Sequence, residues 1–147
     1  MNIYFAGAIR GGREDAELYA TLIQFLKTCS TVLTEHVGND ALLDKELFLS
    51  EEEIFDRDIQ WLEQADVLIA EVSTPSLGVG YELAVAEKLG IPCCCLFRKQ
   101  QHRTLSAMIA GNPFFKVIVY EDSTEAVTRI STFLQQSSII KSVPSQN

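Results

Sequence analysis

Two carboxylates in this sequence have the residue type and the setting for acid–base chemistry. The first is Asp58, which lies in a segment whose apolar residues recur at the spacing of a helix. Its neighbours three and four residues away are all apolar: Ile54, Phe55, Trp61 and Leu62. An aspartate on an apolar helix face is unusual, and desolvation raises the pKa of such a carboxyl and keeps it protonated. Asp58 is therefore a candidate general acid, whereas Asp56 has polar neighbours and is expected to be solvated. An aspartate that caps a neighbouring loop amide would show the same pattern.

The second carboxylate, Glu82, ends a glycine- and serine-rich stretch, STPSLGVGYE at residues 73–82. This stretch joins an apolar strand-like run, 66–71, to a helix-like run, 80–89, and such junctions hold ligands in α/β sheets. Its glycines let backbone N–H groups approach a ligand, and its serines add hydroxyl donors. The dipole near a helix N-terminus favours a charged carboxylate, so we expect Glu82 to be ionised. A glutamate that only stabilises its own helix is the alternative.

One neutral and one ionised carboxyl form the pair that breaks glycosidic bonds. The proton goes to the leaving group, and the carboxylate attacks or stabilises the sugar carbon. Tyr4 begins an apolar strand, from which its phenol could reach the same crevice, although a core tyrosine with a satisfied hydroxyl has the same pattern. Arg10 precedes Gly11 in a glycine-rich turn and could bind a phosphate bidentately, or it could be an ordinary surface arginine.

Five apolar runs alternate with helical patterns and must position these residues. The predicted strands are 2–8, 31–34, 67–70, 91–97 and 115–120, and the predicted helices are 14–28, 50–64, 80–89, 104–110 and 122–136. This alternation predicts an α/β fold, a flavodoxin-like three-layer sandwich with a five-stranded parallel sheet of order 2-1-3-4-5. We expect one domain over residues 1–137 and a flexible C-terminal tail over 138–147.

Composition narrows the function classes. The 147 residues carry a formal charge of −8, which argues against binding to a nucleic-acid backbone. No apolar run approaches the ~20 residues of a membrane span, so no membrane partner is expected. Three adjacent cysteines, 93–95, lie in an apolar run and indicate buried thiols in a reducing compartment. We expect a cytoplasmic protein and leave nuclear entry open, since no basic cluster indicates import.

Several segments, taken together, resemble a known family. They are YFAGAIRGGRED at 4–15, VLTEH at 32–36, DIQWLEQAD at 58–66, PSLGVGYEL at 75–83 and LSAMI at 105–109. In register over about residues 3–110, they resemble the 2′-deoxynucleoside 5′-phosphate N-hydrolases, including 5-hydroxymethyl-dUMP N-hydrolases, of the nucleoside 2-deoxyribosyltransferase superfamily. The resemblance implies a Rossmann-like fold and a homodimer.

The resemblance also implies residue roles. Glu82 corresponds to the nucleophile that forms a deoxyribosyl ester, Asp58 to the acid that assists departure of the base, and Tyr4 to the tyrosine that positions this chemistry. The implied substrate-binding set is Ala8, Ile9, Arg10, Gly11, Ser76, Gly78, Ser106 and Met108. Arg10, Ser76 and Gly78 correspond to the grip on the 5′-phosphate. Ser106 corresponds to a serine that reaches the phosphate in the partner subunit, and Ala8 stands where the family carries serine.

The sequence thus predicts a hydrolase for a small-molecule substrate. It would cleave the N-glycosidic bond of a 2′-deoxynucleoside 5′-monophosphate, with 5-hydroxymethyl-dUMP suggested by the resemblance, and would need no cofactor and no metal. A deoxyribosyltransferase is the nearest alternative, but a nucleoside substrate has no 5′-phosphate for Arg10, Ser76 and Ser106 to hold. A nucleotide-binding sensor without turnover is the alternative from a different class.

Overall fold

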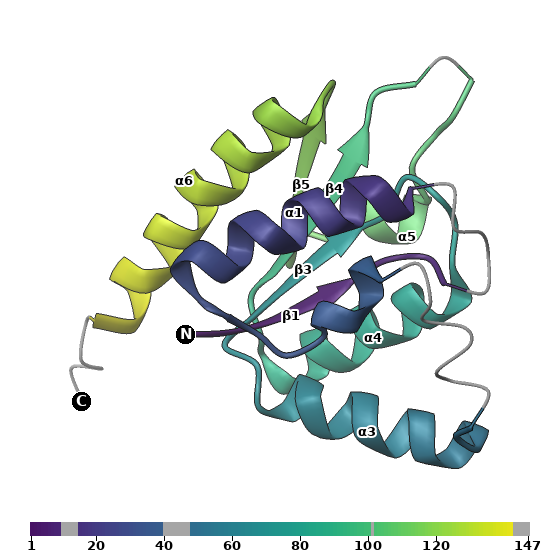
Figure 1. Cartoon of the computed structure of the whole chain (residues 1–147). Helices are drawn as coiled ribbons and strands as arrows, with labels where there is room; N and C mark the ends of the chain where they lie inside the picture. Colours follow the sequence, from purple (N-terminus) through teal and green to yellow (C-terminus); the bar gives the residue numbers. More distant parts are fainter. Residues whose placement is uncertain (10–14, 40–47, 101, 143–147) are drawn as a thin grey trace.

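The computed structural model describes residues 1–9, 15–39, 48–100 and 102–142 (Figure 1). Its centre is a parallel sheet with the strand order β2-β1-β3-β4-β5. The strands are β1 (Asn2–Ala6), β2 (Thr31–Val32), β3 (Val67–Glu71), β4 (Cys93–Arg98) and β5 (Phe115–Tyr120). The predicted α/β class and strand order are therefore confirmed.

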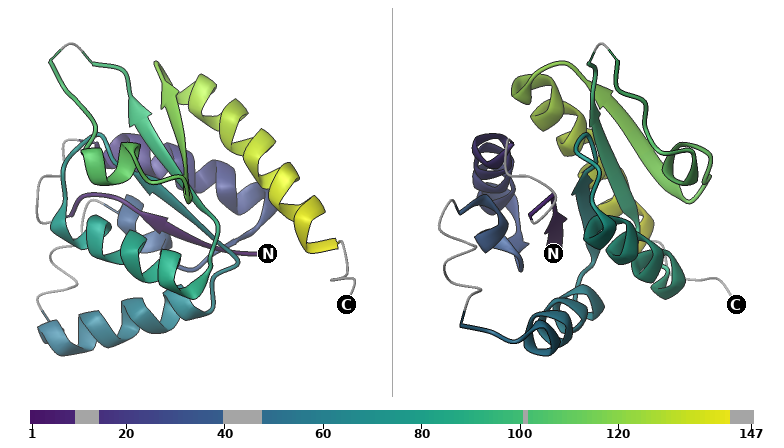
Figure 2. Two further views of the ribbon diagram at one scale, coloured as in Figure 1. Left: turned by 180° about the vertical axis from the view of Figure 1, so that it is seen from behind. Right: turned by 90° about the vertical axis from the view of Figure 1, so that its right-hand side faces the viewer.

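Helices cover both faces of this sheet. They are α1 (Ala16–Cys29), the 3₁₀ helix η1 (Glu35–Gly38), α3 (Glu51–Glu63), α4 (Leu77–Leu89), the short α5 (Ala107–Ala110) and α6 (Ser123–Ser142). Figure 2 shows α1 and α6 on one side of the sheet and α3 and α4 on the other. The result is the three-layer arrangement expected for strands that are apolar on both faces.

The core is divided in two by the sheet because successive strand residues point to opposite faces. On one side Ile3, Phe5 and Ile69 pack with residues of α1 and α6. On the other side Tyr4 and Leu68, paired in register across β1 and β3, pack with residues of α3 and α4. Tyr4 therefore projects from the sheet toward the two helices that carry Asp58 and Glu82.

Several boundaries differ from the predicted ones. β2 ends at Val32 because the Thr34 hydroxyl takes over the contacts of the ladder, accepting from Phe5 N at 2.8 Å and donating to Phe5 O at 2.7 Å. Glu35, directly after the predicted strand 31–34, begins η1. The helix predicted to end at residue 136 continues to Ser142, so the predicted tail begins inside α6.

Local capping signals explain where α3 and α4 begin. Ser50 and Glu53 form a capping box at the start of α3, with each side chain bound to the other residue's backbone N–H. Ser76 caps α4 by accepting from Val79 N, so this helix begins at Leu77, three residues before the predicted start. That shift changes the position of Glu82 along its helix.

Candidate active site

Tyr4 and Glu82 meet between the sheet and α4. The Tyr4 hydroxyl donates a hydrogen bond of 2.7 Å to Glu82 Oε1, although the two residues are 78 positions apart in the sequence. Tyr4 is only 2% exposed. Burial raises the pKa of Tyr4 far above its usual value, and the negative charges of Glu82 and Asp58 raise it further. Tyr4 therefore stays a neutral phenol that donates to the carboxyl group.

The carboxyl of Glu82 is held in a low-dielectric setting. Burial raises the pKa of Glu82 to about 7, the Asp58 charge also raises it, and the Tyr4 hydrogen bond opposes both. This shift is opposite in direction to the one predicted from the helix N-terminus. The helix dipole acts mainly within the first turn of a helix. Because α4 begins at Leu77, Glu82 is its sixth residue and lies beyond that turn.

Asp58, on α3, is partly buried and paired with a cation. Its Oδ1 accepts from Nε of Arg57 at 2.8 Å and lies 2.8 Å from the other guanidinium nitrogen, NH2. The guanidinium of Arg57 also lies 4.9 Å from the ring centroid of Trp61. Phe55 is 49% exposed, so the apolar wall predicted around Asp58 is incomplete. An ion pair is a contact of the carboxylate form, which contradicts the expectation that Asp58 is held protonated by its helix neighbours alone.

Three elements thus bring the predicted catalytic side chains into one cluster. Tyr4 comes from β1, Asp58 from α3 and Glu82 from α4, and the charge of Asp58 raises the pKa of both other groups. Two carboxyls that interact electrostatically titrate as a pair. Close to neutral pH the cluster can therefore hold one proton and one negative charge.

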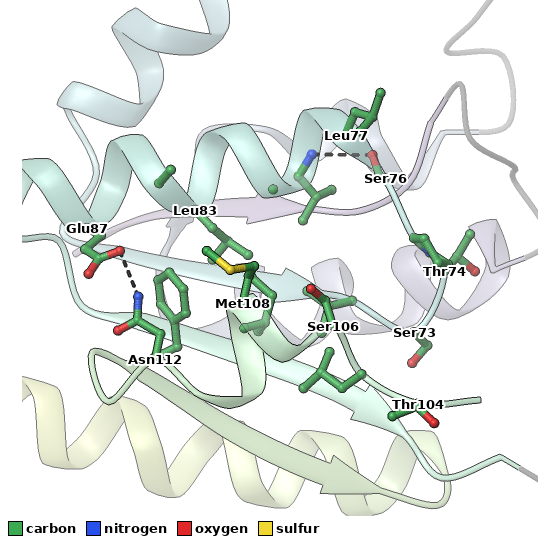
Figure 3. Close-up of a pocket in the computed structure, with 18 residues that line it drawn as sticks. Ser73, Thr74, Ser76, Leu77, Leu83, Glu87, Thr104, Ser106, Met108 and Asn112 are labelled. Carbon is green, nitrogen blue, oxygen red and sulfur yellow. Dashed lines mark hydrogen bonds between the residues drawn. The ribbon is translucent and has the colours of Figure 1, made fainter. Parts of the chain in front are cut away.

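A cavity of about 450 Å³ lies on the other side of α4, between this helix and α5. Figure 3 shows hydroxyl-bearing side chains gathered at one end of it, and a hydrogen bond of 2.9 Å from Asn112 to Glu87 at the other. The labelled hydroxyls are those of Ser73, Thr74, Ser76, Thr104 and Ser106. The described residues that line this cavity do not include Tyr4, Asp58 or Glu82. The hydroxyls of the cavity and the carboxyls of Asp58 and Glu82 therefore lie on different sides of α4.

Only some of the predicted substrate-binding residues line this cavity. Ser76, Ser106 and Met108 line the cavity, and Met108 is 80% exposed. Gly78, the second residue of α4, is also exposed. Ala8, Ile9, Arg10 and Gly11 belong to the segment after β1; Arg10 and Gly11 lie outside the described residues.

Ala8 is buried, and its backbone N–H donates to the Tyr19 hydroxyl at 3.2 Å. Ile9 is half-buried and packs against the core beneath α1. The backbone at Ala8, which leads into the predicted phosphate-binding segment, is thus held against α1 by Tyr19.

Sequence reasoning missed a second polar cluster at the carboxyl end of the sheet. Glu71 is fully buried and accepts hydrogen bonds from Ser73 and Tyr120. Nearby, Asp15 pairs with Arg98 at 2.7 Å. A charged residue that ends an otherwise apolar strand was the one available signal.

In the part of the chain that the structure describes, no group of three or more His, Cys, Asp or Glu side chains could hold a metal ion, and no helix is long and apolar enough to span a membrane.

Comparison with known proteins places the chain in a family. The family model described as "Nucleoside 2-deoxyribosyltransferase" matches residues 3–135. A Danio rerio protein named 5-hydroxymethyl-dUMP N-hydrolase is 49% identical over 132 residues, covering 86% of this chain and 92% of the relative. The Rattus norvegicus protein of that name is 53% identical over 112 residues, covering 75% and 69%. A Trichoplax adhaerens protein named "Putative 2′-deoxynucleoside 5′-phosphate N-hydrolase 1" is 52% identical over 110 residues, covering 75% of each chain.

A solved structure, Clostridium botulinum CMP N-glycosidase, superposes with a TM-score of 0.66 at 18% identity, covering 90% of this chain and 99% of its own. At that identity the likeness supports the fold. The sequence relatives and the family model go further, and the chain belongs to the nucleoside 2-deoxyribosyltransferase family.

Proposed function

We propose that this protein hydrolyses the N-glycosidic bond of 2′-deoxynucleoside 5′-monophosphates to free nucleobase and 2-deoxyribose 5-phosphate. The observation that carries this proposal is the Tyr4–Glu82 hydrogen bond with the charge of Asp58 beside it. The names of relatives at about half identity support this class of substrate, and 5-hydroxymethyl-dUMP is the substrate that two of them name.

The cluster suits a two-step displacement at C1′. Ionised Glu82 attacks C1′, the bond to the base breaks, and its electron pair leaves with the base, which takes a proton from Asp58. Water then hydrolyses the glycosyl–Glu82 ester and releases the sugar phosphate. Because the pKa of Glu82 is raised to about 7, we propose that substrate binding moves the proton of the pair to Asp58 and so creates nucleophile and acid together. No cofactor or metal takes part.

The 5′-phosphate is proposed to lie at the N-terminal end of α4. Ser76 and the exposed backbone at Gly78 can supply donors there, since helix N-termini bind anions. By the family resemblance, the segment Ala8, Ile9, Arg10 and Gly11 forms the other wall, with the Arg10 guanidinium on the phosphate.

A second copy of this chain is proposed to complete the site. Leu77 is 96% exposed and Met108 is 80% exposed, and both flank the cavity between α4 and α5. Exposed apolar side chains around a cavity favour a protein interface. In the homodimer, Ser106 of the partner subunit would reach the phosphate.

Free buried thiols at Cys93, Cys94 and Cys95 suit a reducing compartment, and we propose the cytoplasm with the nucleus as a second location.

A product screen tests the proposed function. The purified protein is incubated with deoxy- and ribonucleoside monophosphates, normal and 5-substituted, and free base and sugar phosphate are measured. We expect release from deoxynucleotides, with 5-hydroxymethyl-dUMP among the best, and loss of turnover by at least ~10²-fold in Glu82→Ala with the fold retained. A protein that binds these nucleotides but releases no base would be a sensor.

The family model favours one second candidate, transfer of the deoxyribosyl group to another base. Adding a second free base to the dGMP reaction distinguishes the two. Formation of a new nucleotide at a rate rivalling hydrolysis would identify a transferase.

A further inference from the structure

Glu71 is a buried carboxyl that the proposed chemistry does not use. It is the last residue of β3, it is 0% exposed, and its side chain lies on the α1–α6 side of the sheet, next to Tyr120. Burial raises the pKa of Glu71, and hydrogen bonds from Ser73 and Tyr120 oppose that effect. A buried carboxyl is costly unless its oxygens are satisfied, so its contacts indicate what it is for.

Three donors converge on this carboxyl. Ser73 donates from its hydroxyl to Oε1 and from its backbone N–H to Oε2 at 3.3 Å, and the Tyr120 hydroxyl donates to Oε1 at 2.9 Å. The Ser73 hydroxyl also accepts from the backbone N–H of Arg98 at 2.7 Å. Glu71 thus fixes both the direction of the Ser73 side chain and the backbone of the loop that follows β3.

The same loop is bound to its neighbours on both sides. Arg103 donates to Ser73 O at 3.2 Å, which ties in the loop between β4 and α5. Asp15, just before α1, accepts from Arg98 at 2.7 Å and from Thr74 at 3.2 Å. Loops from three strands are therefore joined into one network, and most of its groups are buried.

This network leads directly to the residues proposed to hold the phosphate. Ser76 follows Ser73 by three residues, and Ser106 follows Arg103 by three residues. We propose that Glu71 is a positioning residue that holds the loop 73–76 in the geometry that binds the 5′-phosphate. This inference rests on the proposed function, because it concerns the same substrate. Since Glu71 does not touch the Tyr4–Asp58–Glu82 cluster, it affects binding of the phosphate and leaves the bond-breaking step unchanged.

Glu71→Gln tests the inference. The amide keeps the size of the side chain but turns one acceptor into a donor, which opposes either the Ser73 N–H or the hydroxyls of Ser73 and Tyr120. We expect KM for the deoxynucleotide and the Kd for 2-deoxyribose 5-phosphate to rise about tenfold. We expect kcat to stay within about twofold, since only ground- and transition-state binding of the phosphate is lost.

Two further variants keep the test decisive. Tyr120→Phe removes one donor and is expected to raise the same two constants by a smaller factor, and it serves if Glu71→Gln does not fold. Glu121→Gln, at an exposed carboxyl next to Tyr120, is the matched control and should change neither constant. A merely structural role would lower the melting temperature of Glu71→Gln and leave KM and Kd unchanged, and that result would overturn the inference.

The binding arm separates this inference from the proposed function. A wild-type protein that neither releases base nor binds 2-deoxyribose 5-phosphate in calorimetry contradicts the proposed function. A wild-type protein that binds this product, with Glu71→Gln and Tyr120→Phe binding it equally tightly, contradicts only the role of Glu71. A fall in kcat at unchanged KM in Glu71→Gln would also overturn that role.

Discussion

The protonation of two carboxyls decides what the cluster can do. Glu82 is half-buried and faces the charge of Asp58, whereas Asp58 has the Arg57 guanidinium within 2.8 Å. The positions along the two helices suggested a neutral Asp58 and an ionised Glu82. The environments favour the opposite, because burial raises the pKa of Glu82 and the Arg57 guanidinium pairs with the Asp58 carboxylate. The Tyr4 hydroxyl is the one contact in this cluster that lowers the pKa of Glu82, which makes it the natural probe of the nucleophile.

Tyr4→Phe should shift the pH profile to higher pH. The proposed reactive form of the cluster carries one proton, which Asp58 donates to the base, so kcat/KM falls as pH rises through the Glu82 pKa of about 7 and the cluster loses that proton. Removing the hydrogen bond that stabilises the anion raises this pKa, so activity at pH 6 should fall by a larger factor than activity at pH 8. Profiles of kcat/KM between pH 5 and 9 provide the measurement. An alkaline limb at the same pH in both proteins would show that Tyr4 does not control Glu82.

Asp58→Asn should lower kcat by at least ~10²-fold, the usual contribution of a general acid. The amide cannot deliver a proton to the departing base. Asp56→Asn, on the exposed face of the same helix, is the matched control and should stay within about twofold of wild type. Steady-state rates on one deoxynucleotide suffice, and equal losses in the two variants would mean that position on the helix face is irrelevant.

At the scale of the element, helix starts decide where the functional side chains lie. The capping box fixes α3, which carries Asp58, and Ser76 fixes α4, which carries Glu82. Both helices begin with a serine whose side chain accepts from a backbone N–H, so register is set locally before packing begins. A start shifted by one residue would rotate a carboxyl about 100° around its helix.

Ser50→Ala should destabilise the protein by ~1 kcal/mol, because it leaves Glu53 N without its capping oxygen. Urea unfolding measures the loss, and Glu52→Gln, on the exposed first turn, should have a smaller effect. Turnover at low temperature, where the variant stays folded, should remain close to wild type, because α3 is still held against α4. A variant as stable as wild type would show that the capping box contributes nothing measurable.

At the scale of the whole molecule, a shared site predicts complementation between subunits. In a heterodimer of Glu82→Ala and Ser106→Ala chains, one site combines the intact Glu82 of one chain with the intact Ser106 of the other. Mixing the two inactive proteins should therefore restore activity of up to about half the wild-type value per heterodimer. Rates after co-refolding, with heterodimers isolated by two affinity tags, give the measurement.

The control is a mixture of Glu82→Ala and Asp58→Asn chains. Both residues belong to the same cluster within one chain, so each heterodimer site keeps one defect and should stay inactive. Recovery in this control, or none in the first mixture, would contradict the proposed sharing of Ser106.

Much of this protein could be predicted from local patterns. Apolar runs predicted the five strands, helical spacing predicted α3, and the glycine–serine stretch predicted the loop that joins β3 to α4. The grouping of Tyr4, Asp58 and Glu82 also followed, because parallel strand order and family resemblance agree. These properties depend on neighbours within a few residues or on the sheet's topology, and both are readable in the sequence.

The charge states and the buried network were decided by tertiary structure alone. Whether Glu82 is protonated depends on the core packed around it and on Asp58, which is brought there by another helix. The role inferred for Glu71 depends on Tyr120, 49 residues away, and on loops from two further strands. Desolvation and Coulomb interactions act through space, so residues remote in the sequence set them. The sequence by itself determined which elements form and which residues they carry; the fold determined the environment in which each carboxyl works.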